Sequence, residues 1–134
     1  MSEYLDVITA YFNLAQHLTI NSAAYAEVLH PQVEQVEFPN LFNKVVQRRN
    51  FEEIIDNLRA GRELLRDTHY ELQRIMPSST DASVMIEGRW EATYTNDLGP
   101  VTRGQRLGAQ ICSIFELADG KIYRQRQYIC YDQA

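Results

Sequence analysis

The sequence has little of what metal and nucleotide sites need. It contains two cysteines and three histidines, with no C-x-x-C pair, no H-E-x-x-H helix and no cluster of histidines and carboxylates. Metal sites are built from such spacings, so we expect no metal. The six glycines form neither G-x-G-x-x-G nor G-x-x-x-x-G-K, and no G-x-S-x-G elbow occurs. The sequence therefore predicts no cofactor, and either cofactor-free chemistry or plain binding.

Long apolar runs and basic clusters are missing too. No apolar run approaches the roughly 20 residues that span a bilayer, and the opening MSEYLDVITAYF carries acids where a signal peptide carries lysines. The net charge of -5 disfavours a nucleic-acid partner held by phosphate contacts. We expect a cytoplasmic protein that binds neither nucleic acid nor membrane. In that reducing compartment Cys112 and Cys130 should stay free and behave as small buried side chains.

What the chain does contain is helical periodicity in its first half. Apolar residues recur at helical spacing up to residue 15, which predicts a first helix ending near His17. Asn21 is placed to cap a short second helix, which must stop before Pro31 because the residue before a proline avoids the α region. Asn50 and Glu53 have the spacing of a capping box and predict the start of a third helix.

The rest of the chain has the pattern of strands. The segment VEQVEFPN predicts a short strand, and residues 41–49 leave strand and loop open, with KVV favouring a strand. From residue 68 the period changes to two, and an Asp119-Gly120 turn precedes the last run. The strands predicted in this half cover 69–76, 82–95, 105–117 and the segment after the turn. Helices followed by an antiparallel meander, without a linker or repeat, predict one α+β domain over residues 1–134.

The order of these elements and two short motifs carry a resemblance to a known family. Three N-terminal helices, a strand ending in EFPN and the closing FELADGKIYRQRQY resemble the SnoaL-like branch of the nuclear transport factor 2-like superfamily. The resemblance implies a cystatin-like α+β barrel, in which a curved antiparallel or mixed sheet wraps around the N-terminal helices as a cone with a pocket. It also implies a small hydrophobic ligand and a homodimer through the sheet face. Relatives include ketosteroid isomerase, limonene epoxide hydrolase, scytalone dehydratase and polyketide cyclases, so the fold selects no reaction.

The register of the last hairpin decides which side chains face that pocket. A two-residue turn would place Phe115 opposite Arg124, whereas a bulge at Gly120 would place it opposite Tyr123 and reverse every side chain. We favour the bulged register because it pairs apolar and aromatic residues at more positions. The residues that it turns inward are Tyr123, Gln125, Gln127, Ile129 and Tyr131.

The closing strand departs from the family pattern. SnoaL-like proteins commonly carry an aspartate there, in motifs such as R-D-Y or Y-D-C. In this chain Gln127 follows Arg126, and Ile129 precedes Cys130. Neither an amide nor isoleucine exchanges a proton near neutral pH, which favours binding over catalysis.

Two functions stay open. The first is the binding of a small apolar organic ligand without metal, for which the candidate residues are Tyr11, Phe38, Asn40, Trp90, Gln125, Gln127, Ile129 and Tyr131. The alternative is a cofactor-free isomerase, cyclase or dehydratase that works by acid-base chemistry and needs a buried acid or base. Its candidates are Glu37, Glu87, Glu91 and His69. The commoner role of such residues is structural: the glutamates on an exposed strand face, and the histidine at a helix–strand junction.

Overall fold

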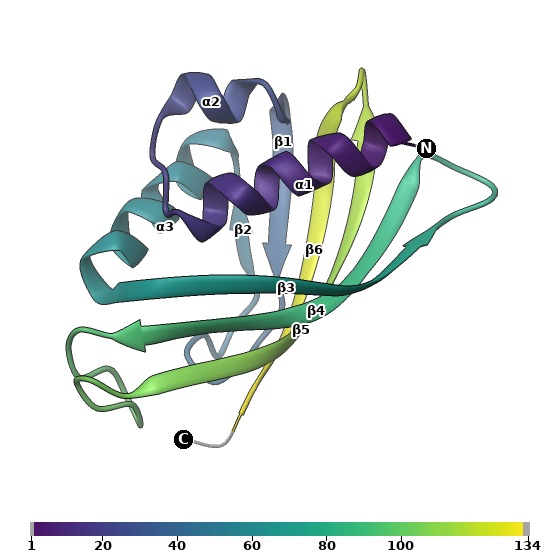
Figure 1. The fold of residues 1–134 in the computed structure, drawn as a ribbon. Coiled ribbons are helices and arrows are strands. Elements are labelled where there is room, and N and C mark those ends of the chain that lie inside the picture. The colour runs from purple at the N-terminus through teal and green to yellow at the C-terminus, as the bar shows by residue number, and fades with distance from the viewer. Residues whose placement is uncertain (1, 133–134) are drawn as a thin grey trace.

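Three helices lie on one side of a curved sheet in the computed structural model, which describes residues 2–132 (Figure 1). The helices are α1 (Ser2–Gln16), α2 (Ser22–Ala26) and α3 (Phe51–Leu64). Asn21 caps α2 by accepting hydrogen bonds from two backbone N–H groups, and the capping box of Asn50 and Glu53 begins α3. Both predicted caps are therefore confirmed. No described helix is long and apolar enough to cross a lipid bilayer.

The six strands form one mixed sheet in the order β2-β1-β6-β5-β4-β3. Their bounds are β1 (Leu29–Glu37), β2 (Gln47–Arg49), β3 (Leu65–Pro77), β4 (Ser83–Tyr94), β5 (Arg106–Ala118) and β6 (Lys121–Tyr131). β1 runs parallel to β6, and all other neighbours are antiparallel. The predicted α+β class and mixed sheet are confirmed. The barrel is a correction: β2 and β3 remain as two edges, so the sheet is open.

Tertiary pairing lengthens several strands beyond their predicted limits. β1 begins at Leu29, where the sequence favoured the end of a helix, because Leu29 pairs with Ile122 of β6. β3 begins at Leu65, directly after α3, because Leu65 pairs with Tyr94. The undecided segment 41–49 ends in the short strand β2, which pairs with β1.

The β5–β6 hairpin follows neither predicted register. Asp119 and Gly120 form the two-residue turn, with φ angles of 55° and 73° as a type I′ turn requires. The pairing then shifts by one residue at Tyr123, so that Phe115 lies opposite Gln125. This bulge gives β6 the alternation that the other register predicted, but with different partners.

Tyr123 is the residue that this bulge displaces from the predicted inward set. Its ring packs edge-on against His30, with centroids 5.0 Å apart, and Arg124 lies over it at 3.8 Å. The extra residue of a bulge has no partner in the ladder, so it does not follow the alternation of its neighbours. Tyr123 therefore does not contribute to the pocket described below.

The core lies between the helices and the concave face of the sheet. Tyr11 and Phe12 of α1 pack edge-on against the fully buried Phe115, with ring centroids 6.1 and 5.7 Å apart. Edge-to-face aromatic pairs add about 0.5–1.5 kcal/mol each beyond the area they bury. These contacts hold α1 across the sheet.

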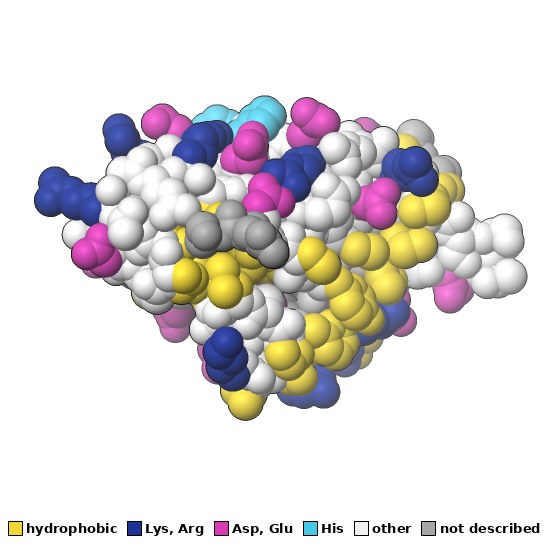
Figure 2. Space-filling model, turned by 90° about the horizontal axis from the view of Figure 1, so that it is seen from below, with side chains coloured by type: hydrophobic (Ala, Val, Ile, Leu, Met, Phe, Trp, Pro, Cys, Tyr) yellow, Lys and Arg dark blue, Asp and Glu magenta, His cyan; other side chains and the backbone are white. Residues whose placement is uncertain are grey.

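The outer face of the sheet carries a band of hydrophobic side chains (Figure 2). Met85 pairs with Ile114 there, Cys112 pairs with Tyr128, and Tyr128 is 41% exposed. Both cysteines are free, as expected, but the expectation that they are buried is wrong: Cys112 is half-buried and Cys130 is exposed. Their positions on β5 and β6 place them on the face that no helix covers.

Candidate functional site

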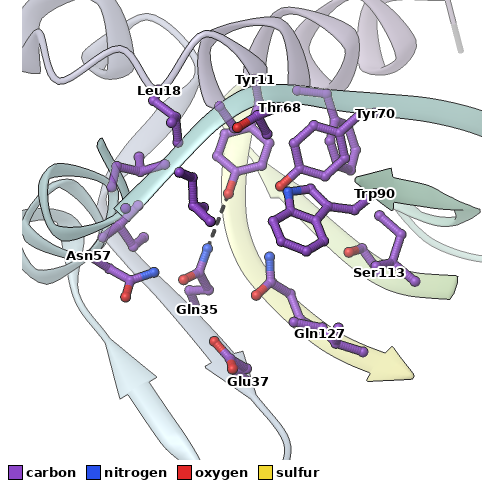
Figure 3. Close-up of a pocket in the computed structure, with 18 of the residues that line it drawn as sticks. Tyr11, Leu18, Gln35, Glu37, Asn57, Thr68, Tyr70, Trp90, Ser113 and Gln127 are labelled. Carbon is purple, nitrogen blue, oxygen red and sulfur yellow. Dashed lines mark hydrogen bonds between the residues drawn. The ribbon is translucent and has the colours of Figure 1, made fainter. Parts of the chain in front are cut away.

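A pocket lies between the concave face of the sheet and helices α1 and α3 (Figure 3). Its volume is about 160 Å³. An engineered apolar cavity of about 150 Å³ is large enough for benzene, so this pocket fits a molecule of about one ring. The apolar part of its wall consists of Phe12, Ala15, Leu18, Ile54, Leu58, Leu65, Ile111 and Ile129. The polar side chains in the wall are Tyr11, Gln35, Glu37, Asn57, Thr68, Tyr70, Trp90, Ser113, Gln127 and Tyr131.

The structure brings together part of the predicted ligand-binding set. The members that line the pocket are Tyr11, Trp90, Gln127, Ile129 and Tyr131. They come from α1, β4 and β6, three elements far apart in the sequence. Gln125 is on the same inward face of β6 but is not part of the pocket wall. It is buried in the core, with 1% of its surface exposed.

Phe38 and Asn40, two other members of the predicted set, lie outside the pocket wall. Phe38 follows the inward-facing Glu37, so alternation puts it on the opposite side of the sheet. There its ring stacks on Tyr128 at a centroid distance of 4.7 Å. Asn40 belongs to the loop after β1, where its Nδ2 donates to Glu37 Oε2 at 2.7 Å. Its side chain therefore holds a wall residue in place.

Among the candidate acids and bases, only Glu37 lines the pocket. His69 is exposed and lies opposite Glu91 in the β3–β4 ladder, so both occupy the face away from Tyr70 and Trp90. Glu87 is on that outer face too, 3.7 Å from Arg74. Alternation along β3 and β4 thus removes these three residues from the pocket.

Glu37 is bound on both of its carboxylate oxygens. Oε1 accepts from Arg49 Nη1 at 2.9 Å, while Oε2 accepts from Nδ2 of Asn40 and of Asn43 at 2.7 and 2.8 Å. The side chains of Glu37 and Arg49 are only 8% and 11% exposed. Glu37 therefore anchors the loop of residues 38–46 and compensates a buried cation.

A row of polar side chains crosses three neighbouring strands beside Glu37. Arg49 pairs with Gln35 in the β1–β2 ladder, and Gln35 pairs with Gln125 in the β1–β6 ladder. Arg49 Nη1 donates to Gln35 Oε1 at 3.1 Å, and Gln35 Nε2 donates to Gln125 Oε1 at 2.9 Å and to Tyr11 Oη at 3.1 Å. Sequence reasoning missed Gln35 and Arg49. The alternation of Val33, Gln35 and Glu37 along β1 was the available signal.

Comparison with known proteins identifies this architecture. The SnoaL-like domain family matches residues 8–125. The chain belongs to the SnoaL-like family. The predicted family and the nuclear transport factor 2-like fold are thereby confirmed. No protein of curated function matches the chain in sequence.

Three solved structures show how widely the fold is shared. A SnoaL-like polyketide cyclase of Agrobacterium tumefaciens is 12% identical, with a TM-score of 0.71 over 94% of this chain and 90% of its own. An LEH-like epoxide hydrolase of M. tuberculosis is 20% identical, with a TM-score of 0.66 over 98% and 84%. A Catenulispora acidiphila protein of ketosteroid isomerase-like fold, in complex with trimethylamine, is 11% identical, with a TM-score of 0.69 over 91% and 83%. Identities this low establish the fold alone.

Two buried polar atoms of this SnoaL-like domain have no hydrogen-bond partner among the described residues. They are Thr68 Oγ1, in the pocket wall, and Gln125 Nε2, below it. Nearly all buried polar atoms in native proteins are paired, so each unpaired atom needs a reason. A bound molecule that supplies the partner is one such reason.

The tyrosines of the SnoaL-like pocket keep their protons at neutral pH. Burial raises the pKa of Tyr11, while the hydrogen bond from Gln35 and the charge of Arg49 act against that rise. Burial also raises the pKa of Tyr70 and of Tyr131. Each of these three hydroxyls can therefore donate a hydrogen bond.

Elsewhere the SnoaL-like domain has a second, more open hollow of about 430 Å³ between the end of α2, the start of β1 and the start of α3. Its wall includes the exposed residues Pro31, Asn50 and Glu52, and Asn50 is committed to the cap of α3. Across residues 2–132, no three histidine, cysteine or acidic side chains lie together as metal ligands. The first pocket is therefore the better candidate for function.

Proposed function

We propose that this SnoaL-like domain binds one small, largely apolar organic molecule in the pocket, without a metal ion. The main observation in support is a cavity of about 160 Å³. Its wall combines aliphatic and aromatic side chains with a few polar groups that hydrogen bonds hold in place. Sites for small molecules generally have this composition. The unpaired Thr68 Oγ1 in the wall supports the same function, since a ligand atom can satisfy it.

The contacts of Glu37 favour binding over chemistry. Its two oxygens already accept three hydrogen bonds, from Arg49, Asn40 and Asn43. A general base needs a free lone pair within hydrogen-bond reach of the proton it removes. A carboxylate that is holding a loop and a cation has little capacity left for that role.

Trp90, the only tryptophan, reports directly on the pocket that it lines. We expect its fluorescence emission to change and then reach a plateau as ring-sized probes such as acetophenone and ethylbenzene are added. Ile129→Phe should weaken binding about tenfold, because the added ring atoms fill part of the cavity. The control is Tyr128→Phe, which changes the residue before Ile129, on the outer face of the sheet. If the Trp90 fluorescence of the wild-type protein responds to neither probe, the proposed binding function is wrong.

An acid-base enzyme is the second candidate, because Glu37 lines the pocket. The same acetophenone samples, made up in D₂O, test it by NMR. An active Glu37 would remove a methyl proton next to the carbonyl and return a deuteron, and Glu37→Gln would slow that exchange by about 10²–10⁴-fold. Equal exchange rates with wild-type protein, Glu37→Gln and buffer would leave binding as the function.

We also infer that two copies pack through the outer sheet face. The band of hydrophobic side chains on this face includes Tyr128, which is 41% exposed, and neighbouring charges such as Arg126 and Glu116 already pair at 2.8 Å within the chain (Figure 2). Sedimentation equilibrium should therefore show a dimer at micromolar concentration, and Tyr128→Arg should shift it toward monomer. A wild-type protein that is still monomeric at 100 μM would contradict the inference, because its free energy of dimerisation would then be weaker than about −5.5 kcal/mol.

A further inference from the structure

The orientation of the Gln35 amide follows from chemistry. A guanidinium group donates hydrogen bonds and cannot accept them. Arg49 Nη1 lies 3.1 Å from one end of the Gln35 side chain, so that end is the amide oxygen. The amide nitrogen must then face the other way, toward Tyr11 and Gln125.

Counting hydrogens on that amide decides the direction of the next bond. The NH₂ group of Gln35 carries two hydrogens. One goes to Gln125 Oε1 at 2.9 Å and the other to Tyr11 Oη at 3.1 Å. Tyr11 therefore accepts from Gln35, and its own proton is left for a different acceptor. Among the hydrogen bonds of the described residues, the Tyr11 hydroxyl donates to none.

Other donors point toward the same space. Figure 3 shows the hydroxyl groups of Tyr11 and Tyr70 and the indole nitrogen of Trp90 directed into the middle of the pocket. An indole N–H donates only, and a protonated phenol donates one bond. Thr68 Oγ1 adds a hydroxyl with no partner among the described residues. The strongest acceptor in the wall, Glu37, already takes three hydrogen bonds.

We propose that Arg49, acting through Gln35, orients the Tyr11 hydroxyl as a donor into the pocket, so that the pocket selects molecules with a neutral acceptor oxygen such as a ketone, ester or ether. This inference rests on the proposed binding function. Tyr11 is the residue that contacts the ligand oxygen. Gln35, in the pocket wall, and Arg49, outside it, are positioning residues that act through Tyr11.

The acceptor oxygen has to be neutral because the pocket offers no spare positive charge. Arg49 is the cation of the polar row, and its Nη1 is shared between Gln35 Oε1 and Glu37 Oε1. A carboxylate ligand would lie near the Glu37 carboxylate without a cation of its own. Burying such an uncompensated charge is costly.

Acetophenone and ethylbenzene form a matched pair of probes, since they differ in shape mainly by a carbonyl in place of a methylene. We expect Tyr11→Phe to lower the ratio of acetophenone affinity to ethylbenzene affinity by about 3–10-fold, the value of one hydrogen bond. Taking the ratio cancels general effects on the pocket. In infrared spectra, the carbonyl of bound acetophenone should absorb at lower frequency in the wild type than in Tyr11→Phe. Tyr128→Phe should change neither quantity.

Gln35→Glu tests the positioning step with almost no change in shape. A carboxylate at position 35 can still accept from Arg49, but it can only accept from Tyr11. The tyrosine proton then turns away from the ligand, so the carbonyl frequency should rise to the Tyr11→Phe value although the tyrosine is still present. Arg49→Lys keeps a group that only donates and should retain the wild-type frequency. Tyr11→Phe remains a complete test if Gln35→Glu does not fold.

The outcomes separate this inference from the function on which it rests. Suppose that both probes bind, but that the carbonyl frequency of bound acetophenone is the same in the wild type and in Tyr11→Phe. That result would overturn the assignment of Tyr11 as the donor and leave the binding function standing. An unchanged frequency in Gln35→Glu would overturn the role of Gln35 and Arg49. A Trp90 emission that neither probe alters would remove the binding function and the inference together.

Discussion

Replacing Arg49 with methionine is expected to lower the free energy of unfolding by about 3–5 kcal/mol, the usual cost of leaving one member of a buried ion pair alone. The Arg49 and Glu37 side chains are 11% and 8% exposed, and their contact is 2.9 Å. Methionine keeps much of the apolar stem but removes both hydrogen bonds from Nη1. Urea denaturation of the purified variant measures the loss.

Two comparisons show whether burial is the reason. Arg59→Met removes a similar contact of 3.0 Å to Asp56, but those side chains are 55% and 66% exposed, so the change should stay within about 0.5 kcal/mol. The double variant Arg49→Met, Glu37→Met removes both charges and should recover part of the loss. A loss of less than about 1 kcal/mol for Arg49→Met would contradict the buried pair.

The parts of the fold that depend on neighbours in the chain were predictable from the sequence. Asn21 caps its helix through the next residues, and Asn50 and Glu53 bond to each other three residues apart. The turn at Asp119 and Gly120 is equally local. For the same reason the predicted order of helices and strands largely holds.

Pocket residues were predictable only where alternation along one strand determined their side. Trp90, Gln127 and Tyr131 line the pocket as predicted, because the inward face of their strands could be read from apolar neighbours. Phe38 was assigned to the pocket but lies outside its wall, because its side depends on where β1 ends. The true partners across β6 depend on the bulge at Tyr123, which the sequence does not mark.

The row of Arg49, Gln35 and Gln125 shows a second limit. Its members lie on β2, β1 and β6 and meet only when these strands pair in one register. Arg49 falls in a three-residue strand, too short for a periodic pattern. Side chains that function through pairing across a sheet therefore remain hidden from a reading along the chain.

Gly88→Ala is expected to destabilise the protein by about 1–3 kcal/mol or more, because β4 approaches the backbone of β3 at this residue. An added Cβ would overlap the carbonyl oxygen of Glu71 and lie 3.2 Å from the Cα of Leu72. Both are backbone atoms, which cannot rotate away as a side chain can. The pairing of β3 with β4 also shifts between Leu72 and Arg74, opposite this glycine.

The same substitution should disturb the pocket, because Gly88 lies two residues before Trp90 and Tyr70 pairs with Trp90 across the two strands. We expect altered Trp90 emission together with the lower stability. Gly61→Ala is the control for stability alone, because Gly61 also lines the pocket. Its Cβ would meet only side-chain atoms, at 3.6 Å or more, and alanine in a helix is about 0.5–1 kcal/mol better than glycine. If Gly88→Ala were as stable as Gly61→Ala, with unchanged emission, β3 would have to move away from β4 at no cost, and the close strand approach that shapes this wall of the pocket would be wrong.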